Sequence, residues 1–318
     1  MFYSIRHTTR FIYSASVAES VTEVRMQPRS EGLQRCLKFE LATQPRAQIL
    51  GYRDYLSNLV HHFDIPGRHV QLKITAESTV EVTPPPPLPE RLPEDSWQAV
   101  DETANSGEFW DYLSPSRFAE RTALLDELRS ELKIERLGDP LSTMRRLNST
   151  IYESFDYAPQ TTSVDSPIDD ALRARHGVCQ DFAHIMIALG RRLGIPCRYV
   201  SGYLYHETER RDRSQERATH AWVEAYLPKL GWIGFDPTNN LIPGERHIRT
   251  AIGRDYADVP PTRGVFKGAA QSELSVNVQV SPSEALPLLE EEPVLMATWS
   301  GPPPHHDDQQ QQQQQQQQ

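Results

Sequence analysis

The sequence predicts an α+β fold in which a β-rich segment precedes a core of helices and antiparallel strands. Apolar and polar residues alternate over residues 70–82, as in a strand with one buried and one solvated face. Over residues 179–193 apolar residues instead recur every three or four positions, which indicates a helix with a buried face. With 318 residues, the chain is long enough for two ordinary domains or for one core with a substantial addition.

Residues 1–83 have the composition of a small β-sandwich or half-barrel. Short runs rich in β-branched and aromatic residues are separated by turn signals at 54–58 and 65–67. Strands at this spacing are typical of small all-β domains. The predicted strands cover residues 3–9, 10–13, 37–41, 59–63 and 70–82.

The clearest boundary in the chain is the proline run that follows Thr83. Consecutive prolines favour a stiff, extended backbone, so we interpret residues 84–93 as a linker rather than as a ligand for a proline-binding module. A second domain, the core, is then expected over residues 94–281. Residues 282–318 are rich in proline, glutamate and glutamine, and this low-complexity composition predicts a disordered tail.

Helical periodicity dominates the first half of the core. Residues 94–135 are predicted to be helical, and a short helix over 168–175 follows a loop at 157–167. Residues 273–280 alternate well enough to form one more strand. A further helix is predicted over residues 140–155, and its inward side chains are Met144, Leu147, Ile151 and Phe155.

The central helix of the core begins near Cys179. Gly177 permits a sharp entry, and Gly194 followed by a proline ends the helix. Cys179 therefore lies in the first turn, where free backbone N–H groups and the positive end of the helix dipole stabilise a thiolate. The same N–H groups can hold a developing oxyanion. Cys179 is thus a candidate nucleophile.

A base and its orienting group are predicted on a hairpin downstream. His220 opens a strand over 219–227, and a turn leads into a second strand that ends at Asp236. Such a hairpin brings Asp236 back beside His220, where the carboxylate can fix the imidazole tautomer and leave the other ring nitrogen for the thiol. The other residues expected on the His220 face are Trp222, Glu224 and Tyr226.

Several residues are candidates for supporting roles. The second oxyanion donor is the N–H of Gln180, the N–H of Cys179 or the hydroxyl of Tyr157, and the sequence does not choose among them. Asp181 and His184 lie three positions apart on the helix, so they can pair with each other or cap the site.

A metal site is not expected. The spacing of Cys179, Asp181, His184 and His220 fits no metal template, and helical geometry points Cys179 and His184 to different sides. Trp222 is predicted beside His220 on the same strand face. No cofactor is predicted.

The cysteine count and the ends of the chain indicate a reduced compartment. Three cysteines without paired spacing suggest neither a disulfide framework nor a zinc site, and we interpret Cys197 as a small core residue and Cys36 as structural. The N-terminus lacks an apolar signal segment, and no window is long enough to span a membrane. The expectation is a cytoplasmic protein.

A net charge of −10 without a basic stripe argues against nucleic acid as a partner. The oligomeric state stays open.

Four segments in order resemble the transglutaminase-like superfamily of papain-type fold, in its bacterial branch. The resemblance is carried by residues 175–184, 194–203, 219–224 and 235–239. The N-terminal segment is similar to the β-type region that accompanies this branch. The residues that match there are Tyr3, His7, Thr8, Tyr13, Pro28, Asp54, Asn58 and Val80-Glu81-Val82.

The resemblance implies Cys179 as nucleophile, His220 as base and acid, and Asp236 as orienting group. The family includes crosslinkers, peptidases and amidases, so it constrains the chemistry more than the substrate. The expected reaction is hydrolysis of a peptide or glutamine-like amide through an acyl-enzyme, because no dedicated amine site or calcium loop is evident. The alternatives are a protein-crosslinking transglutaminase and a non-catalytic binding protein on the same scaffold.

Overall fold

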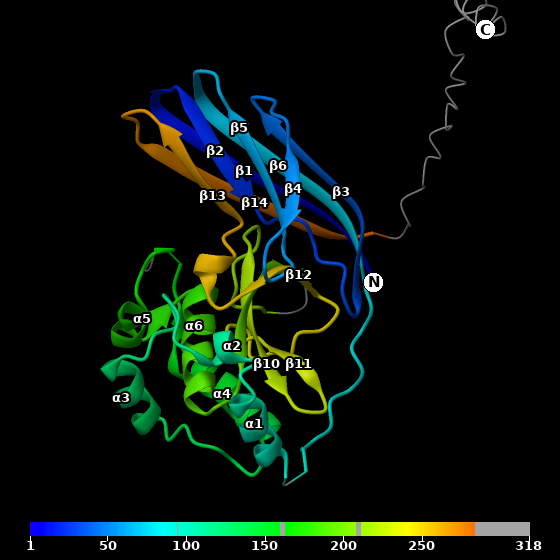
Figure 1. The fold of residues 1–318 in the computed structure, drawn as a ribbon, viewed down its shortest axis with the longest axis vertical. Coiled ribbons are helices and arrows are strands. Elements are labelled where there is room, and N and C mark those ends of the chain that lie inside the picture. Colours follow the sequence, from blue (N-terminus) through cyan, green and yellow to red (C-terminus); the bar gives the residue numbers. More distant parts are fainter. Residues whose placement is uncertain (94, 160–162, 208–210, 284–318) are drawn as a thin grey trace, which may run out of the picture. The chain divides into compact units, whose positions relative to one another are not determined.

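Strands from both ends of the chain form a β-sandwich in this computed structural model, which describes residues 1–93, 95–159, 163–207 and 211–283 (Figure 1). Its two antiparallel sheets share an apolar interior that includes Phe63 of β5 and Leu72 of β6. In spatial order, the strands of the first sheet are β14 (Ser272–Ser283), β1 (Phe2–Val17), β6 (His69–Val82) and β3 (Gln34–Gln44). Those of the second are β13 (Thr262–Lys267), β2 (Glu19–Val24), β5 (Leu59–Ile65) and β4 (Leu50–Arg53).

The last two strands of the described chain complete the sandwich, which corrects the prediction that these segments belong to the core. All of residues 94–281 are predicted to belong to the core, whereas β14 pairs with β1 and β13 pairs with β2. The predicted strand at 273–280 exists within β14. Its partner could not be predicted, because alternation shows that a segment is a strand but not which distant strand it pairs with.

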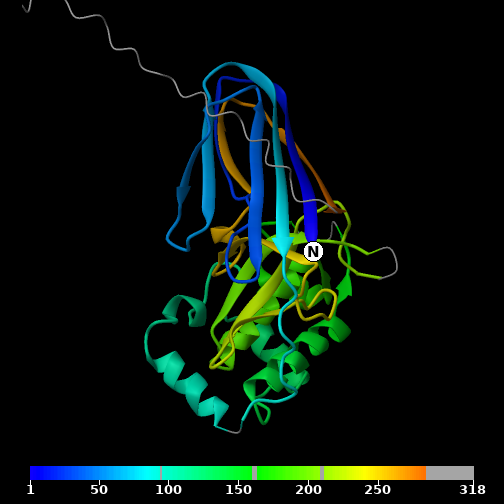
Figure 2. The same ribbon diagram turned by 90° about the vertical axis from the view of Figure 1, so that its right-hand side faces the viewer.

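The proline-rich linker connects β6 to the first helix of the core. Figure 2 shows this cyan segment running from β6 to α1. It is anchored along its way, because Arg145 donates hydrogen bonds to the carbonyls of Pro89 (3.1 Å) and Glu90 (2.7 Å). Leu88 and Leu92 also pack against the apolar interior of the core. The linker therefore forms part of the core surface.

The core consists of helices packed on a third four-stranded antiparallel sheet. In spatial order, its strands are β11 (Gly231–Phe235), β10 (His220–Leu227), β9 (Cys197–Leu204) and β12 (His247–Gly253). The helices are α1 (Ser96–Asn105), α2 (Trp110–Leu113), α3 (Ala123–Glu131), α4 (Pro140–Ser154), α5 (Ile168–Ala174), α6 (Cys179–Arg192) and the short 3₁₀ helix η1 (Tyr256–Asp258). A short parallel pair, β7 (Asp156–Tyr157) and β8 (His176–Gly177), precedes α6. The fold is α+β, as predicted.

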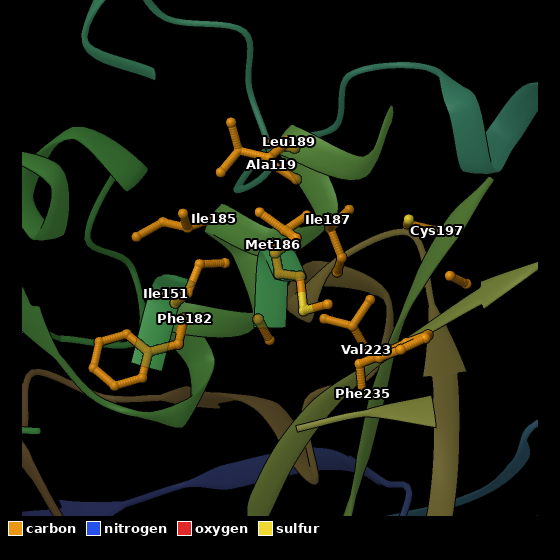
Figure 3. Close-up of a cluster of buried hydrophobic side chains, with 14 of the residues drawn as sticks. Ala119, Ile151, Phe182, Ile185, Met186, Ile187, Leu189, Cys197, Val223 and Phe235 are labelled. Atoms are coloured by element: carbon orange, nitrogen blue, oxygen red, sulfur yellow. The ribbon is translucent and has the colours of Figure 1, made fainter. Parts of the chain in front are cut away.

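Helix α6 is the centre of this core. Every residue from Gln180 to Arg191 is buried, so the helix contacts neighbours all round. Figure 3 shows Phe182 and Met186 among the surrounding side chains, with Val223 of β10 and Phe235 of β11 nearby. Helix α4 supplies the side chains predicted to point inward: Met144, Leu147 and Ile151 are buried.

The close approach of α6 to β9 explains why a glycine and a cysteine face each other. A Cβ added at Gly190 would lie only 2.5 Å from the Cys197 sulfur, so the contact leaves no room for a methyl group. Cys197 is fully buried, and burial raises the pKa of its thiol to about 12. The prediction that Cys197 is a small core residue is confirmed.

The sandwich and the core share a polar interface along β12, the edge strand of the core sheet. The Gln34 side chain accepts from the N–H of Arg249 (2.8 Å) and donates to its carbonyl (2.9 Å). Asn58 does the same for Ile252, with both distances 2.8 Å. These two carboxamides satisfy backbone groups that an edge strand would otherwise leave open. The two parts accordingly belong to one compact unit.

Candidate active site

Cys179 is the first residue of α6, as the sequence predicts. The first intrahelical hydrogen bond runs from the N–H of Phe182 to the carbonyl of Val178 (3.2 Å). The N–H groups of Cys179, Gln180 and Asp181 therefore precede the helical hydrogen-bond ladder. They are the donors that a helix start offers to a thiolate or an oxyanion.

Asp181 caps this helix start. Its Oδ2 accepts a hydrogen bond from the N–H of Val178 at 2.8 Å. A Cβ at Gly177 would lie 2.7 Å from the same oxygen, so only glycine leaves room for the cap. Asp181 therefore fixes the backbone at which Cys179 begins the helix. Of the two predicted roles, the structure shows the cap, and His184 Nε2 accepts from the N–H of Tyr256 (3.2 Å).

His220 and Asp236 come together at the open end of the β10–β11 hairpin. The antiparallel register pairs Val223 with Phe235, which places Asp236 directly beyond the last paired residue. The Nε2–H of His220 donates to Asp236 Oδ2 at 2.8 Å, and both side chains are buried. This is the contact that the hairpin geometry predicted.

Burial and charge act against each other in this pair. Burial disfavours the charged imidazolium, but the charge and hydrogen bond of Asp236, together with Cys179, raise the pKa of His220 well above its ordinary value. Burial alone would raise the pKa of Asp236, but His220 and His247 hold this pKa well below the usual carboxyl range. A protonated His220 beside an ionised Asp236 is therefore favoured.

The second ring nitrogen of His220 is left for the thiol. Within the described chain, His220 Nδ1 has no hydrogen-bond partner of standard geometry. The thiol of Cys179 lies close enough to act on the imidazole electrostatically. Cys179, His220 and Asp236 thus lie in one continuous arrangement.

Asp236 is held by five donors. Besides His220, its Oδ2 accepts from His247 Nε2 (3.2 Å) and from the side-chain amide of Asn239 (2.9 Å). Its Oδ1 accepts from the backbone N–H groups of Thr238 (3.0 Å) and Asn239 (3.2 Å). A carboxylate with this many donors is fixed in orientation and stays ionised.

His247 is a site residue that the sequence analysis missed. It lies on β12, which reaches the site only because β12 pairs with β9 across the sheet. No local pattern around His247 indicates that pairing. Asn239 lies within the segment quoted for the family resemblance, and the structure adds its contact with the carboxylate.

Tyr157 and Gln180 are the remaining candidates for the second oxyanion donor. Tyr157 on β7 pairs with Gly177, two residues before the cysteine, and burial followed by the charge of Cys179 raises the pKa of Tyr157 to about 12. Its oxygen accepts from the N–H of Gln215 at 3.2 Å, which leaves the hydroxyl proton to donate. The Gln180 side chain instead donates to the carbonyl of Val164 (3.0 Å), so Gln180 faces the site through its backbone.

The indole ring of Trp222 packs against the imidazole rings of both His220 and His247. Its ring stacks against His220, with centroids 6.0 Å apart, and meets His247 edge-on at 5.2 Å. It is almost fully buried, which leaves it no direct route to a substrate carbonyl. We therefore expect Trp222 to hold the rings of His220 and His247 in place rather than to contact a substrate.

The possible metal-ligand atoms of His220, Asp236 and His247 lie within 4.8 Å of one another, so these three residues could together hold a metal ion. It differs from the set weighed in the sequence analysis. The hydrogen bonds account for the cluster, since Asp236 Oδ2 already accepts from both histidines and from Asn239. A cation there would have to displace these bonds.

The comparisons with known proteins place the chain in a family. Residues 131–237 match the transglutaminase-like superfamily, and residues 3–81 match the bacterial transglutaminase-like N-terminal region. An uncharacterized protein of Mycobacterium tuberculosis is 35% identical over 300 residues, which covers 89% of this chain and 93% of the relative. The chain belongs to the transglutaminase-like superfamily, whose members are cysteine-dependent enzymes.

Two further similarities are more limited. A crystal structure of a candidate cysteine protease from Cytophaga hutchinsonii aligns with a TM-score of 0.68 at 23% identity and covers 90% of this chain and 93% of that chain, which shows a shared fold. A protein-glutamine gamma-glutamyltransferase of Pseudomonas aeruginosa is 32% identical over 156 residues, or 46% of this chain and 23% of that protein. Among the described residues, no helix is both long and apolar enough to cross a bilayer.

Proposed function

We propose that this protein is a thiol-dependent acyl-transfer enzyme that hydrolyses an amide of a peptide or protein. The observation that supports this most is the buried hydrogen bond between His220 and Asp236, with the first-turn Cys179 at the other side of the imidazole. A histidine oriented by a carboxylate and placed beside a thiol is the arrangement needed to activate a sulfur nucleophile.

The first half of the reaction forms the acyl-enzyme. With His220 already holding the proton of Cys179, the thiolate attacks the amide carbon to form a C–S bond. The N–H groups at the start of α6 hold the oxyanion, and the hydroxyl of Tyr157, which interacts electrostatically with Cys179, is the candidate side-chain donor. The C–N bond then breaks, and the departing amine or ammonia takes the proton from His220.

The second half regenerates the thiol. A water molecule gives a proton to His220 and attacks the thioester carbon, the C–S bond breaks, and the sulfur takes that proton back. An amine in place of water would give a new amide and make the protein a crosslinker. The similarity to a protein-glutamine gamma-glutamyltransferase supports this second candidate. We place the reaction in a reducing compartment such as the cytoplasm, because all three cysteines are free.

Alkylation by iodoacetamide tests the proposed nucleophile without a known substrate. We expect Cys179 to be labelled at pH 7 at least about tenfold faster than Cys36 or Cys197, as mapped by mass spectrometry. Burial raises the pKa of Cys36 to about 11 and that of Cys197 to about 12, so both stay protonated. His220→Ala should slow the labelling of Cys179, whereas His61→Ala on the sandwich should not. Equal labelling of the three thiols would favour the non-catalytic scaffold.

Turnover separates the two enzymatic candidates. A carboxybenzyl-Gln-Gly dipeptide, with and without hydroxylamine, reports ammonia release by hydrolysis and hydroxamate formation by amine transfer. We expect ammonia release without hydroxylamine, and its loss in Cys179→Ala with the urea midpoint of unfolding unchanged. Activity that persists in Cys179→Ala would end the proposal. Hydroxamate formation with negligible ammonia release in water would transfer it to the crosslinking reaction.

A further inference from the structure

The segment that leads into β10 joins two parts of the candidate active site. The backbone N–H groups of Arg213 (2.7 Å) and Ser214 (3.2 Å) donate to the side-chain oxygen of Asn239, whose amide nitrogen in turn donates to Asp236. The next N–H, that of Gln215, donates to the hydroxyl oxygen of Tyr157 at 3.2 Å. Residues 213–215 therefore connect the carboxylate of the site with its candidate oxyanion donor.

The same segment is anchored at its two ends by parts of the molecule outside the site. The guanidinium of Arg213 donates to the carbonyls of Tyr152 (2.7 Å) and Phe155 (3.4 Å) at the end of α4. It also lies over the Tyr152 ring, 3.4 Å from the centroid. At the other end, the carbonyl of Arg217 accepts from the N–H of Val278 on β14 at 2.9 Å. The backbone that contacts Tyr157 is thus held in place.

The carboxamide of Asn239 uses its full hydrogen-bonding capacity. Its Nδ2 donates to Asp236 Oδ2 (2.9 Å) and to Ser214 Oγ (3.2 Å), while Oδ1 accepts the two backbone N–H groups. Because an ionised carboxylate only accepts, the nitrogen has to face Asp236 and the oxygen has to face the segment. An ionised aspartate would lack the donors, and leucine would lack donors and acceptors alike.

The contact with Gln215 matters for what Tyr157 can do. Its oxygen accepts from that N–H, so the hydroxyl proton is directed away from the segment. Burial, followed by the charge of Cys179, raises the pKa of Tyr157 to about 12, so the hydroxyl keeps its proton at neutral pH. The direction in which Tyr157 donates therefore depends on where the segment lies.

We propose that Asn239 is a positioning residue that holds Asp236 and, through residues 213–215, also holds the Tyr157 hydroxyl that donates to the oxyanion. One side chain then aligns the base side and the oxyanion side of the site. This role rests on the proposed function, because it requires acyl transfer by Cys179.

Two reagents separate these sides, because both modify Cys179 but only one forms an oxyanion. Iodoacetamide alkylates the thiolate by displacement: a C–S bond forms, the C–I bond breaks and iodide leaves. p-Nitrophenyl acetate acylates it through a tetrahedral oxyanion: a C–S bond forms, the ester C–O bond breaks and p-nitrophenolate leaves. Mass spectrometry of the full chain at pH 7 measures alkylation. The release of p-nitrophenolate above the Cys179→Ala background measures acylation.

A double-mutant cycle then tests the coupling. Tyr157→Phe should slow acylation about tenfold and Asn239→Ala about fivefold, while each changes alkylation by no more than about threefold. The double variant should be acylated at most about twofold more slowly than Tyr157→Phe alone, because Asn239 acts through a hydroxyl that is already missing. Arg213→Ala frees the segment from α4 and should behave as Asn239→Ala does, alone and combined with Tyr157→Phe.

The neighbouring asparagine provides the matched control. The side chain of Asn240 accepts from Asn148 and Ser149 of α4, both at 3.0 Å. Its φ of 51° lies in the left-handed region, which glycine adopts without strain. Asn240→Gly should therefore be acylated and alkylated as the unmodified protein is. The urea midpoint of unfolding verifies that each variant is folded, and Arg213→Ala decides the question if Asn239→Ala does not fold.

The possible outcomes separate this role from the proposed function. Effects that multiply in the double variants would overturn the coupling, and so would an equal slowing of acylation and alkylation in Asn239→Ala. Unchanged acylation in Tyr157→Phe, with Cys179 still alkylated rapidly, would overturn the role of Asn239 and leave the proposed function standing. A Cys179 that reacts no faster than Cys36 with either reagent would end both.

Discussion

Asp236 is the residue on which the candidate site depends most. Its carboxylate orients His220, and it is itself oriented by His247, Asn239 and the backbone of the turn that follows. Three of these donors share one oxygen, Oδ2. The strength of the bond to His220 therefore depends on how much of the negative charge the other two donors draw away.

His247→Phe tests this sharing. With one donor removed, Asp236 interacts more strongly with His220, so we expect the pKa of His220 to rise further, by on the order of one unit or less. The measurement is an NMR titration of the His220 Cε1–H resonance. His61→Phe, on β5 of the sandwich, is the control and should leave the titration unchanged. A fall in the pKa would show instead that His247 serves mainly to hold Asp236 in place.

At the scale of elements, the position of β12 decides how the site is completed. The strand carries His247 to Asp236 on one face, and its open edge is closed by Gln34 and Asn58 of the sandwich. Asn58 is itself held by Asp54, whose Oδ1 accepts from the Asn58 N–H (2.9 Å). The N-terminal residues that resemble the family without evident chemistry thus include the group that supports this strand.

Asn58→Ala should therefore destabilise the whole chain. The substitution leaves the buried N–H and carbonyl of Ile252 without their partners, and it removes the 2.7 Å bond from Arg29. We expect a loss of about 3 kcal/mol in the free energy of unfolding, measured with urea. Asn277→Ala, at an exposed position of β14, should change it by no more than about 0.5 kcal/mol. Equal effects of the two substitutions would contradict this role.

The elements also show what the sequence could predict. Helices α4 and α6 and the β10–β11 hairpin are each predicted by periodicity and turn signals within their own stretch of sequence. The contact between His220 and Asp236 follows from the predicted hairpin. The approach of His247 and the pairing of β13 and β14 with the N-terminal strands depend on partners far along the chain. Local patterns carry no information about such partners.

At the scale of the molecule, the sandwich and the core are held as one unit by buried polar contacts as well as apolar ones. Tyr203 of β9 bonds across the interface to His7 Nδ1 (3.0 Å) and to the carbonyl of Met26 (3.3 Å). An apolar cluster that includes Ile5 and Ile248 surrounds this contact. Because the same sheet carries His220, loosening the interface is expected to disturb the site as well.

The buried histidine of this interface makes the stability of the molecule depend on pH. Burial lowers the pKa of His7 from 6.5 to about 4, so the unfolded chain takes up a proton there between these values while the folded chain does not. Stability therefore falls as the pH decreases below about 6.5. His7→Gln removes this titration, and we expect its free energy of unfolding to fall less steeply than that of the unmodified protein, by up to about 1.4 kcal/mol per pH unit. Urea unfolding at pH 8, 7, 6 and 5 measures both slopes. The two curves should run parallel above pH 7 and converge below it, and curves that stay parallel to pH 5 would show that His7 takes up its proton in the folded state.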